Sequence, residues 1–179
     1  MHIQNVAVFC GSRSGNNPRY ESDAKLLGEK LAATGRNIVY GGGNKGIMGA
    51  VANAALQNGG MVKGVIPRIL LEWEVQHTSL TELIVTEDIH QRKKMMYDLC
   101  DAAVILPGGY GTLDELFEML TWNQLNIHSK KIIMLNTAGF FQHLYNHLEK
   151  MEADEFLYNH VEQRIIFCDT VDQVMAAIA

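Results

Sequence analysis

Cysteine is scarce in this sequence, whose 179 residues include only Cys10, Cys100 and Cys168. Their number is odd and no two of them form a CxxC pair, which excludes a disulfide scaffold and suits a reducing compartment. The sequence also lacks any apolar run that approaches the ~20 residues of a membrane-spanning helix. Its first residues, MHIQN, have neither the basic region nor the apolar region of a signal peptide. We therefore expect a cytoplasmic protein that does not associate with a membrane.

An excess of positive charge is absent as well. Lys and Arg number 15 against 20 Asp and Glu, which gives a formal net charge of -5. Affinity for nucleic acid normally depends on many cations, so we expect no nucleic-acid partner. With 47% hydrophobic and 20% charged residues the composition is that of a globular protein. The length suits a single domain over residues 1–179, and any phosphate ligand must be held locally by backbone groups and a few cations.

Short apolar runs alternate with helical stretches along the whole chain. We predict strands at residues 6–10, 37–40, 61–66, 83–86, 102–106, 131–135 and 165–168. Helices are expected at 20–34, 47–58, 89–100, 113–125, 140–151 and 171–178, and a loop or irregular helix at 68–80. The strands are apolar throughout, so both of their faces should be covered. This pattern predicts an α/β protein with a doubly wound, mainly parallel, Rossmann-like sheet, whose ligands bind at the carboxyl ends of the strands.

Three of the predicted strands end in glycine-rich segments: GSRSG at 11–15, GGGNKG at 41–46 and GGYGT at 108–112. Glycine lets the backbone approach an anion closely, and a helix that begins there directs N–H groups at it. Glycine also simply makes tight turns, but three such loops at one edge of a sheet favour a phosphorylated ligand. The second loop matches GxGxxG, yet no acidic residue follows the next strand, which argues against NAD. Ile47 follows Gly46 where a P-loop would have Lys, so ATP hydrolysis is not indicated.

Charged residues accompany the third loop and two other segments. We expect Asp114 and Glu115 in the first turn of the helix over 113–125, where the helix dipole favours carboxylates and where Glu115 could contact sugar hydroxyls. An apolar stripe of this helix should face inward and consists of Leu113, Leu116, Phe117 and Leu120. Glu115 should then lie on another face of the helix. In HQRKK at 90–94, Arg92 could instead pair with Asp88 on a solvated helix face. A further cluster, Glu72, Glu74 and His77, follows Pro67.

Two long motifs, GGGNKGIMG at 41–49 and PGGYGTLDE at 107–115, resemble the Lonely guy (LOG) family of cytokinin riboside 5'-monophosphate phosphoribohydrolases. The family's PGGxGTxxE motif is present in full, and the resemblance extends from the first strand to at least Phe140. It implies hydrolysis of the N-glycosidic bond of a nucleoside 5'-monophosphate by a homodimer that needs no metal or organic cofactor. The base is left open, so a general AMP or nucleotide nucleosidase of salvage remains an alternative.

The resemblance also implies roles for single residues. Glu115 is expected to stabilise the charge that develops on the ribose, with Arg92 as its catalytic partner. The N–H groups from Gly109 to Thr112 are expected to hold the 5'-phosphate. The full set of implied substrate-binding residues is Ser12, Gly43, Glu74, Lys93, Gly109, Tyr110, Gly111, Thr112 and Thr121.

Three other classes of protein fit these residues less well. A non-catalytic nucleotide or molybdenum-cofactor binder would keep the glycine loops without needing both Arg92 and Glu115. Relatives are often labelled lysine decarboxylase, but such chemistry usually needs pyridoxal phosphate on a lysine, and this chain is short for those folds. His143 and His147 have a spacing that can chelate zinc, but the Glu of HExxH is missing between them.

Overall fold

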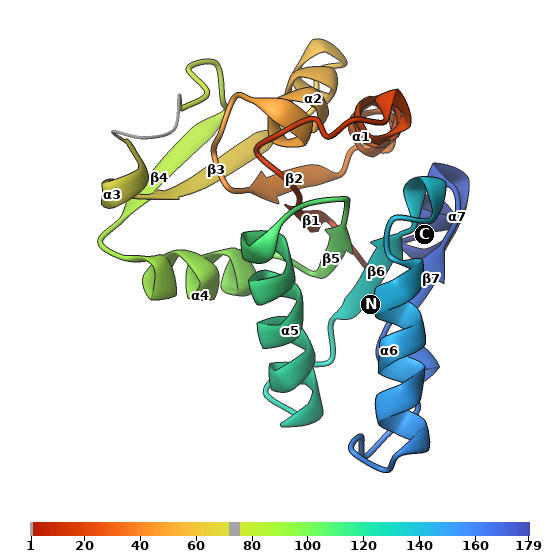
Figure 1. Ribbon diagram of the computed structural model, residues 1–179. Coiled ribbons are helices and arrows are strands. Elements are labelled where there is room, and N and C mark those ends of the chain that lie inside the picture. The colour runs from red at the N-terminus through yellow and green to blue at the C-terminus, as the bar shows by residue number, and fades with distance from the viewer. Residues whose placement is uncertain (1, 72–75) are drawn as a thin grey trace.

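The computed structural model describes residues 2–71 and 76–179. Within these residues, seven strands form one sheet in the order β4-β3-β2-β1-β5-β6-β7, and every neighbouring pair is parallel. The strands are β1 (Asn5–Phe9), β2 (Asn37–Tyr40), β3 (Val62–Pro67), β4 (Glu82–Thr86), β5 (Ala102–Ile105), β6 (Lys131–Leu135) and β7 (Ile166–Cys168). The predicted α/β class and parallel sheet are confirmed (Figure 1).

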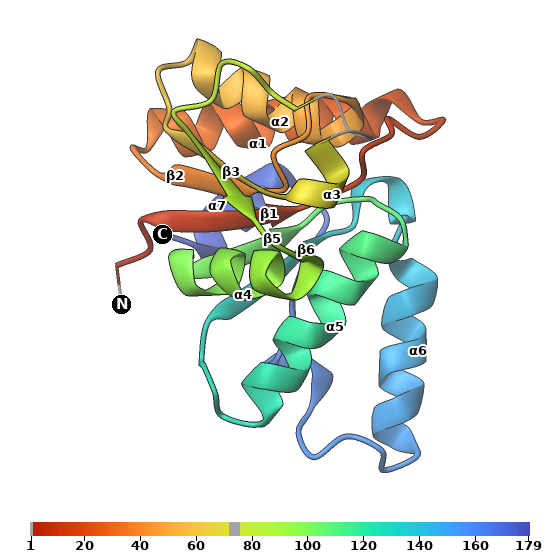
Figure 2. The ribbon, with the colours of Figure 1, turned by 90° about the vertical axis from the view of Figure 1, so that its left-hand side faces the viewer.

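Helices cover both faces of the sheet, as the apolar strands require. One face carries α1 (Pro18–Ala33), α2 (Gly46–Gln57) and α7 (Val171–Ala177), and the other carries α4 (Ile89–Leu99), α5 (Tyr110–Gln124) and α6 (Gln142–Ala153). Figure 2 shows α1 and α2 on one side of the sheet and α4 and α5 on the other. Short helical turns lie at α3 (Arg68–Leu71), η1 (Thr137–Gly139) and η2 (Val161–Gln163).

The alternation of side chains along β1 shows how the two layers are built. Val6 and Val8 face the core beneath α1 and α2, whereas Ala7 and Phe9 face the core beneath α4 and α5. All four are buried, so the strand reads as a continuous apolar run although its side chains alternate between two cores.

The two halves of the sheet diverge between β1 and β5. The chain leaves β1 for α1 on one face, and it leaves β5 for α5 on the opposite face. In open parallel sheets such a divergence leaves a crevice at the carboxyl ends of the strands, and ligands commonly bind there. The first and third glycine loops follow these two strands.

Helix α5 begins three residues earlier than the apolar pattern predicts. Gly109 is its N-cap, and Tyr110, Gly111 and Thr112 form its first turn, which the sequence pattern assigned to a loop. Glycine is a poor helix former, and the first apolar residue is Leu113, so periodicity alone placed the start too late. Asp114 and Glu115 therefore lie in the second turn, and the prediction of acidic residues in the first turn is wrong.

Candidate active site

The three glycine loops contact one another at the carboxyl edge of the sheet. The Gly11 N–H donates to the Pro107 carbonyl at 3.0 Å, and the Met48 N–H donates to the Gly11 carbonyl at 3.2 Å. A Cβ atom on Gly46 would lie 2.5 Å from the backbone of Arg13, so the second loop can pack this closely only without a side chain. The expectation that the loops share one edge is confirmed.

A pocket lies between the first and third loops, where the sheet diverges. Its volume is about 250 Å³. The lining residues come from both loops, from α1 and from the chain after η1: Gly11, Ser12, Arg13, Gly15, Tyr20, Pro107, Gly108, Gly109 and Phe140. The rings of Tyr20 and Phe140 meet edge to face, with centroids 5.6 Å apart. Two predicted binding residues, Ser12 and Gly109, thus border the same cavity, and Arg13 supplies a cation that the sequence did not single out.

The amino end of α5 opens towards solvent. A Cβ atom on Gly109 or Gly111 would meet nothing within 4 Å, whereas one on Gly108 would lie 2.1 Å from the Thr112 hydroxyl. Tyr110 is 94% exposed and Thr112 is buried, so the first turn presents one side to water and packs on the other. The first N–H groups of a helix have no acceptor within the helix, and the dipole makes this end partly positive. The geometry suits an anion such as phosphate.

Arg92 and Glu115 form a buried ion pair beside these loops. Arg92 Nη2 lies 3.5 Å from Glu115 Oε1, and the two side chains are only 10% and 6% exposed. The Arg92 Nε–H also donates to the Val65 carbonyl at 3.1 Å. A Cβ atom on Gly41 would stand 2.3 Å from Arg92 Nη2, so the second glycine loop leaves the space that the guanidinium occupies.

The structure rejects the solvated helix face as the environment of Arg92. The Asp88 side chain caps α4 by accepting from the Gln91 N–H at 2.8 Å, while Arg92 turns inward to Glu115. The predicted stripe of α5 is wrong in part: Leu116 is buried and Leu113 and Leu120 pack against the core, but Phe117 and Glu115 lie on the faces opposite to those predicted. Its buried face consists of Thr112, Glu115, Leu116, Met119 and Asn123, and Phe117 is exposed. Glu115 is on the buried face because Arg92 on α4 compensates its charge, a partner that periodicity within α5 cannot reveal.

Lys93, the residue after Arg92 on α4, also binds side chains of α5. Its Nζ lies 3.0 Å from Asp114 Oδ2 and 2.9 Å from Glu118 Oε2. Burial alone would lower the pKa of Lys93, but the hydrogen bonds and charges of Glu118 and Asp114 outweigh it and raise that pKa. Adjacent cations of α4 thus hold carboxylates on two turns of α5.

Tyr97 was not singled out from the sequence, although it lies one turn after Lys93 on α4. Its hydroxyl is 3.0 Å from Glu118 Oε2 and also donates to the backbone carbonyl of Glu115 at 3.2 Å. Burial raises the pKa of Tyr97, and the nearby carboxylates add to that rise, so the phenol is a hydrogen-bond donor and not an anion. The i, i+4 spacing from Lys93 was the signal that could have pointed to it.

Cys10, at the end of β1, lies within electrostatic reach of the ion pair. Burial raises the pKa of the thiol, the negative charge of Glu115 raises it further, and the charge of Arg92 opposes the rise. The thiol is therefore neutral, and Cys10 is not a nucleophile in this state.

The remaining predicted residues are more dispersed. The Gly43 carbonyl accepts from the Tyr40 hydroxyl at 3.1 Å, and Gly43 forms an isolated antiparallel bridge with Gln76. Glu74 lies outside the described residues. Thr121 is six residues beyond Glu115, about 9 Å along the axis at 1.5 Å per residue. Its role as a substrate contact stays a prediction.

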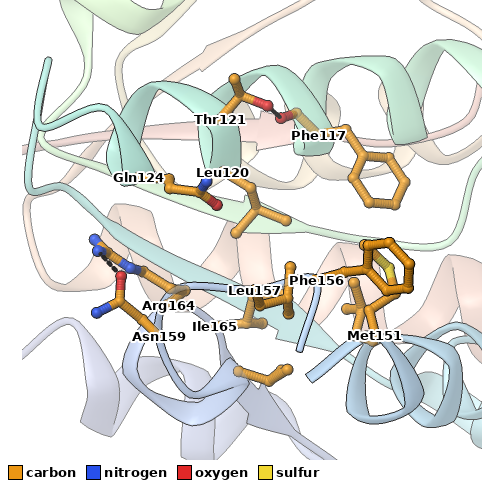
Figure 3. Close-up of a pocket in the computed structure, with 12 residues that line it drawn as sticks. Phe117, Leu120, Thr121, Gln124, Met151, Phe156, Leu157, Asn159, Arg164 and Ile165 are labelled. Carbon is orange, nitrogen blue, oxygen red and sulfur yellow. Dashed lines mark hydrogen bonds between the residues drawn. The ribbon is translucent and has the colours of Figure 1, made fainter. Parts of the chain in front are cut away.

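Thr121 lines a second pocket, of about 280 Å³, between α5 and the chain from α6 to Ile165 (Figure 3). Its hydroxyl donates to the Phe117 carbonyl at 2.7 Å. Apolar side chains dominate the walls: Phe117, Leu120, Leu148, Met151, Phe156, Leu157, Val161 and Ile165. The sequence analysis did not foresee this cavity.

The zinc alternative finds no support in the described residues. His143 and His147 lie exposed on α6, and residues 2–71 and 76–179 contain no group of three or more His, Cys, Asp or Glu side chains arranged to hold a metal ion. Among the same residues, no helix combines the length and the apolar character needed to cross a bilayer.

The fold and the site define a doubly wound α/β protein with three glycine loops at the carboxyl edge of its sheet and a buried carboxylate–guanidinium pair beside them. A family model described as "Possible lysine decarboxylase" matches residues 48–178. A cytokinin riboside 5'-monophosphate phosphoribohydrolase from Rhodococcoides fascians is 40% identical over 176 residues, which cover 98% of this chain and 89% of that protein. An Arabidopsis thaliana relative with the same enzyme name is 42% identical over 164 residues, 92% of this chain and 75% of its own. The chain therefore belongs to the Lonely guy (LOG) family.

Solved structures support the fold. The molybdenum cofactor binding protein from Rippkaea orientalis superposes with a TM-score of 0.74 at 21% identity, over 99% of this chain and 96% of that one. The molybdenum cofactor carrier protein from Chlamydomonas reinhardtii gives 0.72 at 20% identity, over 98% and 94%. At these identities the similarity concerns the architecture alone.

Proposed function

We propose that this chain hydrolyses the N-glycosidic bond of cytokinin riboside 5'-monophosphates and releases the free base and ribose 5-phosphate. The observation that carries the proposal is the buried Arg92–Glu115 pair beside three glycine loops, in a chain of this family. A buried ion pair is a poor way to stabilise a fold, because removing both charges from water costs about as much as their attraction returns. A buried ion pair of this kind, set next to three glycine loops, is therefore better explained by a role in binding or catalysis.

The proposed chemistry follows from the charge that develops during cleavage. As the bond between the ribose and the base breaks, its electrons leave with the base and positive charge builds on the ribose ring. A fixed carboxylate beside the ring stabilises that charge, which is the role we assign to Glu115. Water adds to the anomeric carbon, and its proton is transferred so that the base leaves neutral. Arg92 orients Glu115 through the ion pair, and it stands near the departing base or the phosphate.

The rest of the site would bind substrate. The N–H groups from Gly109 to Thr112 hold the 5'-phosphate at the amino end of α5, where Tyr110 leaves one side open. Ser12 borders the adjoining pocket. The other proposed contacts are Gly43, Lys93 and, on the strength of the family resemblance, Glu74 and Thr121. The proposed reaction requires no metal or organic cofactor.

We also propose that the enzyme is a homodimer. Large apolar side chains are exposed on and just after α5: Phe117, Leu125 and Ile127. Large apolar side chains that are left exposed in this number are often covered by a partner. Multi-angle light scattering should give twice the mass of one chain, and a single-chain mass at working concentration would overturn this part of the proposal.

A reducing compartment such as the cytoplasm completes the proposal. Cys10, Cys100 and Cys168 are all free and buried, which is usual where thiols stay reduced. Subcellular fractionation of the native host should find the protein with the cytoplasmic markers.

The test of the proposed function is base release from a panel of substrates. Purified protein is given isopentenyladenosine 5'-monophosphate, AMP, a pyrimidine monophosphate and the matching nucleosides without phosphate, and products are separated by chromatography. We expect free base and ribose 5-phosphate from the monophosphates, with the cytokinin nucleotide turned over fastest, and no release from the nucleosides. Faster turnover of AMP would indicate a salvage nucleosidase, and nucleotide bound but uncleaved would indicate a binding module.

A further inference from the structure

Residues 76–79 run against the outer side of the second glycine loop. The His77 N–H donates to the Gly42 carbonyl at 3.0 Å, and Gln76 pairs with Gly43 in the isolated antiparallel bridge. On its other side Gly42 packs against β3, where a Cβ atom on Gly64 would lie 2.9 Å from the Gly42 Cα. The loop is thus held between the sheet and the short segment that contains His77.

The His77 side chain ties this segment to α2. His77 is 4% exposed, and its Nδ1 accepts from the Ser79 N–H at 3.2 Å. With Nδ1 as an acceptor, the ring proton is on Nε2, which lies 3.1 Å from Asn53 Oδ1. Burial lowers the pKa of His77, which agrees with a neutral ring.

Asn53 in turn forms hydrogen bonds with Gly49 and with Asn44 of the second loop. Its Nδ2 donates to the Gly49 carbonyl at 2.8 Å and to Asn44 Oδ1 at 3.3 Å. Hydrogen bonds therefore run from Ser79 through His77 and Asn53 to Asn44, which belongs to the second glycine loop.

The position of this loop matters for the ion pair. Gly41 lies so close to Arg92 that a single Cβ atom would clash with the guanidinium, so a small displacement of the loop changes the space available to Arg92. The segment also begins two residues after Glu74, which the proposed function places at the substrate.

We propose that His77 is a positioning residue that acts through Asn53 to hold residues 76–79 on the second glycine loop. In this way it fixes the position of Gly41, which borders the space that the Arg92 guanidinium occupies. This inference rests on the proposed function and adds to it a residue remote from the reacting atoms. The loss of the contact should lower kcat, because Arg92 is misplaced, and should leave KM nearly unchanged, because the phosphate binds at α5.

Two substitutions of His77 distinguish the contact of Nε2 with Asn53 from the contact of Nδ1 with Ser79. In His77→Gln the side-chain amide can reach the Nε2 position and still donate to Asn53, whereas His77→Asn can replace only the Nδ1 acceptor. We expect His77→Asn to lower kcat by about 10- to 100-fold. His77→Gln should keep kcat within about threefold of the wild type. Thermal unfolding of both variants gives the folded fraction by which kcat is normalised.

A double-mutant cycle with Asn53→Ala provides the second measurement. If both residues act through one contact, His77→Asn together with Asn53→Ala should lower kcat no more than either change alone. Asn53→Ala also reports on the contact if His77→Asn fails to fold. Equal kcat in the Gln and Asn variants, or additive losses in the cycle, would overturn the inference. Failure of the wild type to release base would instead count against the proposed function.

Discussion

The two ends of α5 border pockets of similar size, about 250 Å³ near its amino end and about 280 Å³ along its carboxyl-terminal half, but the polar groups around them differ. Near the amino end, four of the nine lining residues are glycines, space is open beside Gly109 and Gly111, and Glu115, the ion-pair partner of Arg92, lies on the following turn of α5. In the other pocket the walls are apolar side chains, and the polar groups bond within the protein: Thr121 to Phe117, and Arg164 to Asn123 and Asn159 (Figure 3).

This difference shows that volume and apolar lining are weak guides to an active site. A catalytic pocket needs donors and charges whose bonding capacity is directed at a ligand. The amino end of α5 has such groups in its first-turn N–H donors. In the second pocket the Thr121 hydroxyl and the Arg164 guanidinium have partners in the protein, so their loss should affect packing before it affects chemistry.

The substitution Glu115→Gln should have the largest effect. It keeps the shape of the side chain but removes the charge that we propose stabilises the ribose, so we expect kcat to fall by about 10²–10³-fold. Base release is measured by chromatography, and Glu149→Gln, on the exposed face of α6, is the matched control. If the Glu115→Gln enzyme retains most of its activity, Glu115 is not the catalytic carboxylate, and the amino end of α5 no longer differs from the other pocket in this respect.

Leu148→Ala tests the second pocket by a change in stability. Leu148 is buried in the core beneath α6 and lines that pocket, so its truncation should lower the free energy of unfolding by about 2–5 kcal/mol. Urea unfolding measures the loss, and kcat/KM per folded molecule should stay at the wild-type value. A fall in kcat/KM at constant stability would assign a role in catalysis to this pocket.

Gly41→Ala tests whether the second loop sets the position of Arg92. The added methyl would overlap with the guanidinium, which can move aside because it ends a flexible side chain. We therefore expect a fall in kcat of about 10- to 100-fold, with a small change in melting temperature. If kcat is unchanged while the protein is strongly destabilised, the contact serves packing and not the ion pair.

Thr121→Val measures how much the proposed substrate contact of Thr121 contributes. The isosteric change removes a hydroxyl that also bonds to its own helix, so we expect only a small rise in KM, within about threefold. An unchanged KM would remove Thr121 from the proposed substrate contacts.

The smallest expected effect is a pH-dependent change in stability at His160. Its hydrogen bond and ion pair with Glu152 raise the pKa of His160 above its ordinary value of 6.5. The stabilisation is fully present below pH 6.5 and is lost as the pH rises through the raised pKa. The difference in melting temperature between the wild type and His160→Gln should shrink towards alkaline pH, and kcat should be unaffected. A constant difference across this range would contradict the assignment.

The sequence allowed most of the fold to be predicted because its strands are short, apolar and separated by clear helical stretches. Prediction failed at the start of α5, where Gly109 and Gly111 conceal a helical turn from any rule based on apolar spacing. It failed again for the inward face of α5, because a rule that buries apolar residues places Phe117 inside and Glu115 outside.

The candidate site was predicted from motifs and not from geometry. The motifs led to Arg92, Lys93 and Glu115, and the structure confirms that the glycine loops share one edge of the sheet. The contacts of His77, Tyr97 and Gly41 could not be predicted, because each joins segments far apart in the sequence. Such contacts depend on how β-strands and helices pack, and a single sequence contains no direct record of that packing.

Cys10 gives the proposed active site an unusual neighbour. Alkylation and thiol–disulfide exchange both require the thiolate, and the raised pKa of this cysteine keeps it protonated. The cysteine close to the Arg92–Glu115 pair is therefore small, polarizable and resistant to oxidants for as long as the protein is folded. The enzyme should tolerate oxidative stress at its centre, and its thiols should become reactive only when the sheet opens.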